Sequence, residues 1–228
     1  MKLVIKGITH PVLGMVLMMT LITILSTSCD NHEPIDRNIH VGYVLCNDHS
    51  CMDTASYFNQ TKRKAVGVVF AEKTDDHPAL AVMFDELNEV FCDSVGMVNG
   101  TSTDITSFCG FKNTVAMYNS YSAETGKGSP LAMEMINFHA NGQSDYLPCV
   151  AEQRLLASSA RVINPVLEKL GGTPIALEGD CWYWTSTEVE DNPGVQAWLC
   201  TTDNGRFLAT QKTQRHKARA IVEIYDPE

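Results

Sequence analysis

Residues 46–51 read Cys-Asn-Asp-His-Ser-Cys and bring two thiols and one imidazole close together in the chain. Zinc binds such groups, but a structural zinc site uses four ligands, and no second paired cluster lies nearby in the sequence. In an oxidising compartment the same spacing favours a short disulfide loop. We therefore expect a disulfide between Cys46 and Cys51, with zinc binding by Cys46, His49 and Cys51 as the alternative.

The other cysteines extend this prediction. The chain has 8 cysteines, which are many for a cytosolic protein of this size and ordinary for an exported one. We expect Cys92 and Cys109 to form a second disulfide and Cys149 to remain a free thiol. Other pairings stay open, because spacing alone does not fix disulfide connectivity.

Three oxygen-bearing side chains followed by a proline at residues 190–193, Glu-Asp-Asn-Pro, could indicate a calcium site. Calcium-dependent lectins combine several such oxygens, which also face the hydroxyls of a sugar. Here the order differs from the lectin motifs, no Trp-Asn-Asp follows, and ordinary turn chemistry accounts for the run. The sequence therefore predicts no metal ion or other cofactor.

Residues 212–217, Lys-Thr-Gln-Arg-His-Lys, concentrate positive charge on an acidic chain of net charge -10 and pI about 5.1. One interpretation of this run is a solvated strand end. The other is a local positive patch that binds an acidic ligand such as a uronic or sialic acid. In that case Arg215 could bind the carboxylate of the ligand with two hydrogen bonds. The overall acidity argues against nucleic acid as a partner.

Motifs for catalysis are missing from the sequence. It holds no Gly-x-Ser-x-Gly and no His-Glu-x-x-His, and Gly126-Lys127-Gly128 lacks the upstream glycine and the following hydroxyl residue of a phosphate-binding loop. We therefore expect a non-enzymatic protein.

The elements that must position these residues follow from patterning. Apolar β-branched runs predict an early hairpin, residues 85–110 indicate a loop, and Ser129-Pro130 marks the start of a helix. Asp203-Asn204-Gly205 predicts a hairpin turn near the C-terminus. The predicted strands are 41–45, 65–71, 79–84, 182–186, 196–201, 206–211 and 218–225, and the predicted helices are 112–121, 129–142, 150–160 and 164–170.

The N-terminus has the pattern of an export signal. Lys2 and Lys6 precede an apolar run from Pro11 to Leu25, which is too short for a permanent membrane span of about 20 residues. The run ends in small residues before Cys29, which resembles the lipobox of bacterial lipoproteins and implies acylation of Cys29; plain secretion is the alternative. We predict a signal peptide at 1–28, a lipidated tether at 29–38 and one domain at 39–228, held at the bacterial envelope as an outer-membrane lipoprotein.

The C-terminal half resembles a known group of proteins. The segments that carry the resemblance are 166–174, Val-Leu-Glu-Lys-Leu-Gly-Gly-Thr-Pro, 183–188, Tyr-Trp-Thr-Ser-Thr-Glu, and 219–222, Arg-Ala-Ile-Val, with a weaker match at 67–70, Gly-Val-Val-Phe. They are similar to the DUF1566 / Lcl-C-terminal-like bacterial surface proteins and to the lipoproteins that diversity-generating retroelements mutate. The resemblance implies an α+β, C-type-lectin-like fold of two main helices with small antiparallel β-sheets. In such a fold we expect Trp184 and Trp198 to be core aromatics.

The resemblance also implies a binding surface on the closing strands, because the diversified positions of those families lie between the Tyr-Trp motif and the last strand. The expected function is a lipid-anchored envelope protein that recognises a glycan or protein ligand. One alternative is a structural or adhesin subunit of a surface assembly, and another is an enzyme of the formylglycine-generating type. The predicted ligand-binding residues are Glu190, Asp191, Asn192, Gln196, Asn204, Arg206, Gln211, Lys212, Gln214, Arg215, His216 and Lys217.

Overall fold

The computed structural model describes residues 38–94, 96–137 and 145–225. The chain divides into two units, Met1–Asn38 and Ile39–Glu228, and the fold described below is that of the second. The predicted leader at 1–28 and the predicted acylation site at Cys29 lie outside the described residues. Among the helices within those ranges, none has the length and apolar character needed to cross a membrane.

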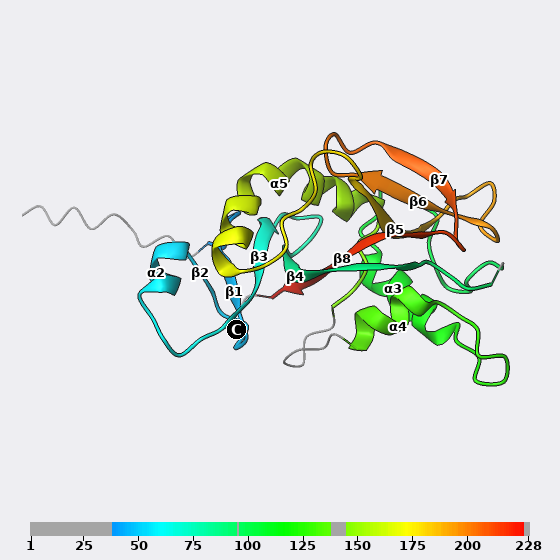
Figure 1. The fold of residues 1–228 in the computed structure, drawn as a ribbon, viewed down its shortest axis with the longest axis horizontal. Coiled ribbons are helices and arrows are strands. Elements are labelled where there is room, and N and C mark those ends of the chain that lie inside the picture. The colour runs from blue at the N-terminus through cyan, green and yellow to red at the C-terminus, as the bar shows by residue number, and fades with distance from the viewer. Residues whose placement is uncertain (1–37, 95, 138–144, 226–228) are drawn as a thin grey trace, which may run out of the picture. The chain divides into compact units, whose positions relative to one another are not determined.

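The strands of the described chain form one mixed sheet in the order β2-β1-β3-β4-β8-β5-β6-β7 (Figure 1). Neighbouring strands are antiparallel except β5 and β8, which are parallel and pair at Tyr183 and Lys217. The last strand in sequence thus lies inside the sheet and joins its N-terminal and C-terminal halves. The strands are β1 Val44–Cys46, β2 Cys51–Met52, β3 Ala65–Ala71, β4 Ala79–Val90, β5 Trp182–Glu188, β6 Gln196–Thr201, β7 Phe207–Gln211 and β8 Arg215–Ile224.

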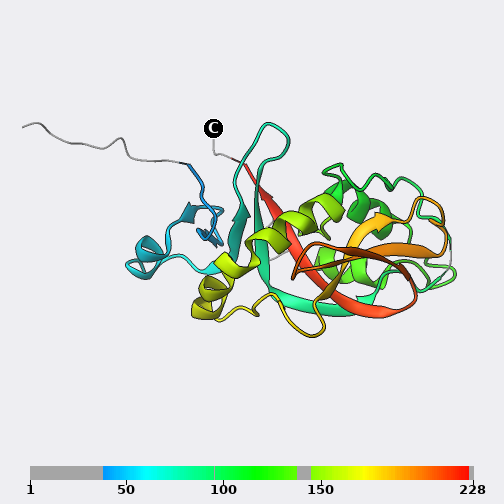
Figure 2. The same cartoon turned by 90° about the horizontal axis from the view of Figure 1, so that it is seen from above.

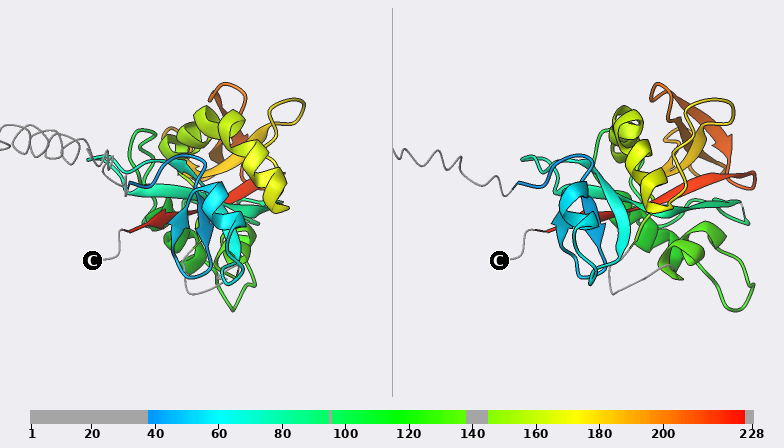
Figure 3. Two further views of the ribbon diagram at one scale, coloured as in Figure 1. Left: turned by 90° about the vertical axis from the view of Figure 1, so that its left-hand side faces the viewer. Right: turned by 60° about the vertical axis from the view of Figure 1, so that its left-hand side comes forward.

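Helices cover both faces of this sheet. The helix α5 lies on one face and crosses over β4 and β8, whereas α3 and α4 lie on the opposite face (Figures 1, 2 and 3). The short helix α2 follows β2 at the N-terminal edge. The helices are α2 Thr54–Phe58, α3 Gly110–Asn119, α4 Pro130–Asn137 and α5 Val150–Leu170.

Successive side chains of a strand point to opposite faces of the sheet, so each face has its own hydrophobic core. Val68 and Phe70 of β3 pack in a cluster with Ile163 of α5. Val69, between them, points to the other face and belongs to a cluster that includes Met117 of α3. These side chains are almost fully buried, and each contributes about 1.5–3 kcal/mol of transfer free energy. The two-faced core explains why β3 is apolar throughout.

The two tryptophans lie on opposite faces. Trp184 is fully buried in the α3–α4 cluster, as predicted, and its indole N–H donates to the Glu89 carbonyl at 3.1 Å. Trp184 pairs with Leu199, so Trp198 points the other way. There it is only partly buried and packs edge-on against Phe207, with ring centroids 5.0 Å apart. The expectation that both are core aromatics is therefore wrong for Trp198.

Helix α5 runs unbroken through Pro165, although the sequence predicts two helices there. Proline removes one backbone hydrogen bond, to the carbonyl of Arg161, and Arg161 is exposed so that water can replace it. Asn164 helps to hold this region, because its side chain bonds both the amide and the carbonyl of Ile175 at 2.8 Å. Gly171 then ends the helix with φ 81, as predicted.

The predicted strands are confirmed, although the first begins only at Val44, and most helix positions are confirmed as well. The end of the helix predicted at 129–142 lies outside the described residues. Strand β2 and helix α2 were not predicted from the sequence, and residues 85–90 are strand and not loop. The β4 strand continues to Val90 because β8 pairs with it on both sides of a bulge between Val82 and Glu86. Arg219 of β8 fills this bulge: its Nε donates to the Met83 carbonyl at 3.0 Å, and its Nη2 donates to the Thr173 carbonyl. The buried guanidinium thereby also fixes the chain that leaves α5.

The predicted C-type-lectin-like fold is wrong. That fold requires small separate antiparallel sheets, whereas this chain has one 8-stranded mixed sheet between two helical layers. The difference arises from β8, which pairs with the long β4 on one side and with β5 on the other. Most strands and helices were predictable one by one, but this pairing brings them together in a different architecture.

Candidate functional site

The predicted recognition surface lies on β6, β7, β8 and their connecting turns. In the turn from β6 to β7, the Asn204 side-chain oxygen accepts from the Thr201 hydroxyl at 2.9 Å and from the Arg206 amide at 3.2 Å. Gly205 follows with φ 69, a left-handed conformation that glycine adopts without strain. The predicted hairpin turn at 203–205 is therefore confirmed.

The predicted ligand-binding residues fall into three environments. The exposed ones are Glu190, Asp191, Asn192, Asn204, Arg206, Gln211, Gln214 and Arg215. The partly exposed ones are Gln196, His216 and Lys217. Lys212 is fully buried, with a side-chain exposure of 0%, and is unable to contact a surface ligand. A binding role for the others stays a prediction.

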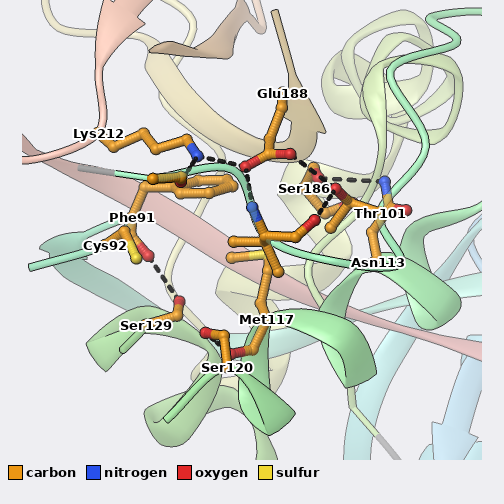
Figure 4. A network of polar contacts seen from close by, with 12 residues as sticks. Phe91, Cys92, Thr101, Asn113, Met117, Ser120, Ser129, Ser186, Glu188 and Lys212 are labelled. Carbon is orange, nitrogen blue, oxygen red and sulfur yellow. Dashed lines mark hydrogen bonds and ion pairs between the residues drawn. The ribbon is translucent and has the colours of Figure 1, made fainter. Parts of the chain in front are cut away.

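Lys212 instead forms a buried ion pair with Glu188 at the end of β5 (Figure 4). Its Nζ also donates to the Gly96 carbonyl at 2.9 Å. Glu188 accepts from the Val98 amide at 3.0 Å and from the Thr101 hydroxyl at 2.7 Å. Both carboxylate oxygens and the ammonium are thus occupied in holding the loop at 96–101 against the sheet, so Glu188 has a structural role.

Asn113 of α3 continues this network (Figure 4). Its Nδ2 donates to the Ser186 carbonyl at 3.1 Å, and its Oδ1 accepts from the Ser102 amide at 2.8 Å. The side chain is fully buried and joins three segments, namely α3, β5 and the loop. Buried polar groups of this kind orient the surrounding chain when they have partners. The network is therefore a support for the closing strands and not a ligand site.

The remaining cations of residues 212–217 have acidic or carbonyl partners. Arg215 is 2.7 Å from the Glu89 carboxylate, and Lys217 donates to the Asp180 carbonyl at 2.7 Å. Arg206 lies at the other end of β7, in the β6–β7 turn, and its side chain is 69% exposed. Of the two interpretations of residues 212–217, these contacts favour a solvated strand end over a positive patch.

Strand β7 lies at one edge of the sheet, close to these residues. Because β7 ends the strand order, its far side pairs with no other strand of the described chain. The Arg206 carbonyl and the Lys212 amide bond toward the β6 side, at 2.7 and 3.0 Å. Backbone groups of an antiparallel strand alternate in direction, so those of Phe207, Ala209 and Gln211 point outward.

A cavity of about 190 Å³ lies beside the β4 bulge. Its walls are apolar except for Asp85 and Asp145, and Asp145 is almost fully buried. The Oδ1 atom of Asp145 has no hydrogen-bond partner, and burial raises the pKa of this carboxyl to about 7. The cavity thus contains a carboxyl that is partly neutral near physiological pH.

The cysteines of the described chain are free thiols. Cys92 donates to the Gly128 carbonyl at 2.9 Å, whereas Cys109 contacts Cys149, the cysteine predicted to be unpaired. The structure thus brings Cys109 to Cys149 and not to Cys92. Cys46 and Cys51 lie on the paired strands β1 and β2. In the described ranges, no three His, Cys, Asp or Glu side chains gather into a group that could hold a metal ion.

Comparisons with known proteins identify a shared fold. No family model matches the chain, and no curated protein matches it. A solved structure described as a fimbrial protein from Bacteroides ovatus ATCC 8483 is similar, with a TM-score of 0.59 and 14% sequence identity. The match covers 81% of this chain and 49% of that one, so this chain spans about half the length of the fimbrial protein. At this identity the similarity shows that the two proteins share a fold.

Proposed function

We propose that the protein is a structural or adhesin subunit of an assembly on the bacterial cell surface. The observation that carries the proposal is the fold that most of this chain shares with a fimbrial protein. A subunit of such an assembly needs a surface that takes up a neighbouring subunit. The open edge of β7 has the properties of that surface.

Nothing in the composition of β7 blocks pairing with another strand. Edge strands usually carry charged residues, proline or bulges that prevent association, and the sequence of β7, Phe-Leu-Ala-Thr-Gln, has neither charge nor proline. Phe207 is 39% exposed and Leu208 is 51% exposed. An extended segment of a neighbouring subunit could bond to the outward backbone groups and cover these apolar side chains.

The opposite edge of the sheet is built differently. Its strand β2 has only two residues, and Asp53 starts the helix α2 directly after it, accepting from the Ser56 amide at 2.9 Å. A very short edge strand followed by a helix offers little backbone to a partner. The sheet therefore favours association at β7 over association at β2.

Attachment to the envelope would come from the N-terminal segment. The lipobox-like sequence before Cys29 supports acylation of that cysteine and a location at the outer membrane. Metabolic labelling with a fatty-acid analogue tests this part. The wild-type chain should incorporate the label and Cys29→Ser should not; labelling of both would overturn the assignment of Cys29.

Assembly at β7 is tested by co-purification from gently solubilised envelopes. Ala209→Pro removes one outward amide donor without removing a bond to β6, and Ala209→Thr keeps that donor and suits a strand. The proline variant should lose its association with higher-order complexes, whereas the threonine variant should keep it. If both variants have the thermal stability of the wild type and assemble equally well, β7 is not the assembly surface.

A further inference from the structure

Cys109 and Cys149 occupy equivalent places in the fold. Cys109 is the residue at the start of α3, and Cys149 is the residue at the start of α5. The two thiols are neighbours, and each shifts the pKa of the other. The Cys149 thiol also donates to the carbonyl of Ser107 at 3.0 Å, which holds its sulfur beside the chain that leads into Cys109.

The backbone around the two cysteines fixes this approach. A Cβ atom at Gly110 would lie 2.1 Å from the Glu152 carboxylate and 2.9 Å from the Leu147 carbonyl, so only glycine lets α3 pack this closely on the start of α5. Thr114 adds a second tie, because its hydroxyl accepts from the Leu147 amide at 3.0 Å. The two helix starts are therefore held together independently of the thiols.

We propose that Cys109 and Cys149 form a disulfide that joins the start of α3 to the start of α5. Because α3 and α5 lie on opposite faces of the sheet, the bond would link the two helical layers of the domain. The proposal is independent of the surface-assembly function.

The surroundings give the two thiols different roles. Cys109 is partly exposed, whereas Cys149 is fully buried. The contact with Cys149 lowers the pKa of Cys109, and the same contact raises the pKa of Cys149. Asn113 Nδ2 also donates to the Cys109 sulfur, at 3.4 Å. Cys109 is thus the accessible thiolate, and Cys149 is the thiol that completes the bond.

The oxidation requires a disulfide-bearing co-reactant, such as oxidised glutathione or a thiol oxidoreductase. The Cys109 thiolate attacks one sulfur of that disulfide, forms a mixed disulfide and releases the co-reactant's other sulfur as a thiolate. Cys149 then gives up its proton to water and attacks the Cys109 sulfur, which releases the second thiolate. Two protein thiols lose two electrons and two protons in all, and one external disulfide is reduced to two thiols.

The direct test maps the cysteines of the full-length wild-type chain. The protein is equilibrated with oxidised glutathione, free thiols are alkylated, and the peptides are identified by mass spectrometry without reduction. We expect a linked peptide that contains Cys109 and Cys149. Recovery of Cys109 linked to Cys92, or of both Cys109 and Cys149 in alkylated form, would overturn the proposal.

Thermal unfolding supplies a second readout. Reduction with dithiothreitol should lower the midpoint of the oxidised wild type by about 5–10 °C. Cys109→Ser and Cys149→Ser should abolish this difference, whereas the control Cys92→Ser should keep it. A difference of the same size in the Cys109→Ser and Cys149→Ser variants would assign it to another pair of cysteines. If a serine variant does not fold, the peptide map of the wild type still decides.

Discussion

Lys212, just after β7, and Glu188, at the end of β5, form an ion pair in which neither side chain has any exposed surface. The desolvation of the two charges is offset here by hydrogen bonds to a third segment, the loop at 96–101. Such a pair contributes little net stability compared with apolar residues, but either charge alone is costly to bury. The pair therefore sets how the loop and the closing strands fit together.

Lys212→Met should reduce the free energy of unfolding by about 3–5 kcal/mol, because Glu188 then remains buried without its cation. The double variant Lys212→Met/Glu188→Gln should recover about 2 kcal/mol of that loss, since the neutral amide oxygen still accepts from the Val98 amide. Urea denaturation of the single and double variants measures this coupling. Strictly additive losses would show that the pair does not act as a unit.

Gly110→Ala should destabilise the protein by about 2–3 kcal/mol, although alanine is the better helix former. The new Cβ would meet the Glu152 carboxylate and the Leu147 backbone, and backbone has little room to move. Gly194→Ala is the matched control, because its nearest neighbour would be 3.8 Å away. Equal midpoints for the two variants in chemical denaturation would contradict the close packing of α3 on α5.

Arg219→Lys should also destabilise the domain, by about 2–3 kcal/mol. The guanidinium donates in two directions, to Met83 and to Thr173, and the single ammonium of lysine cannot reproduce that fork. Arg161→Lys, on the exposed side of α5, should change stability by less than about 0.5 kcal/mol. Differential scanning calorimetry on the two variants tests this difference. It separates the role of the buried Arg219 guanidinium from a general effect of replacing arginine by lysine.

Local patterning predicted most strands because they carry their own signals, but it missed β2 and the second half of β4. The run Ala65–Ala71 is apolar and β-branched, and Asn204-Gly205 marks a turn whatever lies around it. Continuity of α5 was not predictable in this way, because Pro165 is a helix breaker unless the surrounding structure accommodates it. The order of the strands depends on pairing between distant segments, which local patterns do not encode.

The same limit explains the errors in the candidate site. Lys212 belongs to a run of polar residues, which predicts an exposed side chain. Its partner Glu188 is 24 positions away, so the local sequence does not indicate the buried ion pair. In the structure Thr210 and Lys212 are buried and alternate with exposed neighbours, but the sequence of this stretch is polar throughout and does not indicate that alternation. The pair of Cys109 and Cys149 likewise needs the packing of two helix starts, although each cysteine directly precedes a predicted helix or lies close to one.

Asp145 should make the stability of the protein depend on pH. Burial raises the pKa of its carboxyl to about 7 in the folded state, above the value of 3.8 expected in an unfolded chain. The folded state therefore binds the proton more tightly, so the contribution is fully present below about pH 4 and is lost as the pH rises toward 7. Glu152, whose pKa burial also raises to about 7, acts in the same direction.

Asp145→Asn should remove the Asp145 part of this dependence. At pH 8 the variant should be more stable than the wild type by about 1–3 kcal/mol, because no charge has to be buried, whereas at pH 4 the two should be nearly equal. Urea denaturation between pH 4 and pH 8 measures the difference, and the slope that remains in the variant reports on Glu152. A wild type whose stability rises from pH 4 to pH 8 in parallel with the variant would show that Asp145 is ionised in the folded protein, with a partner that compensates its charge.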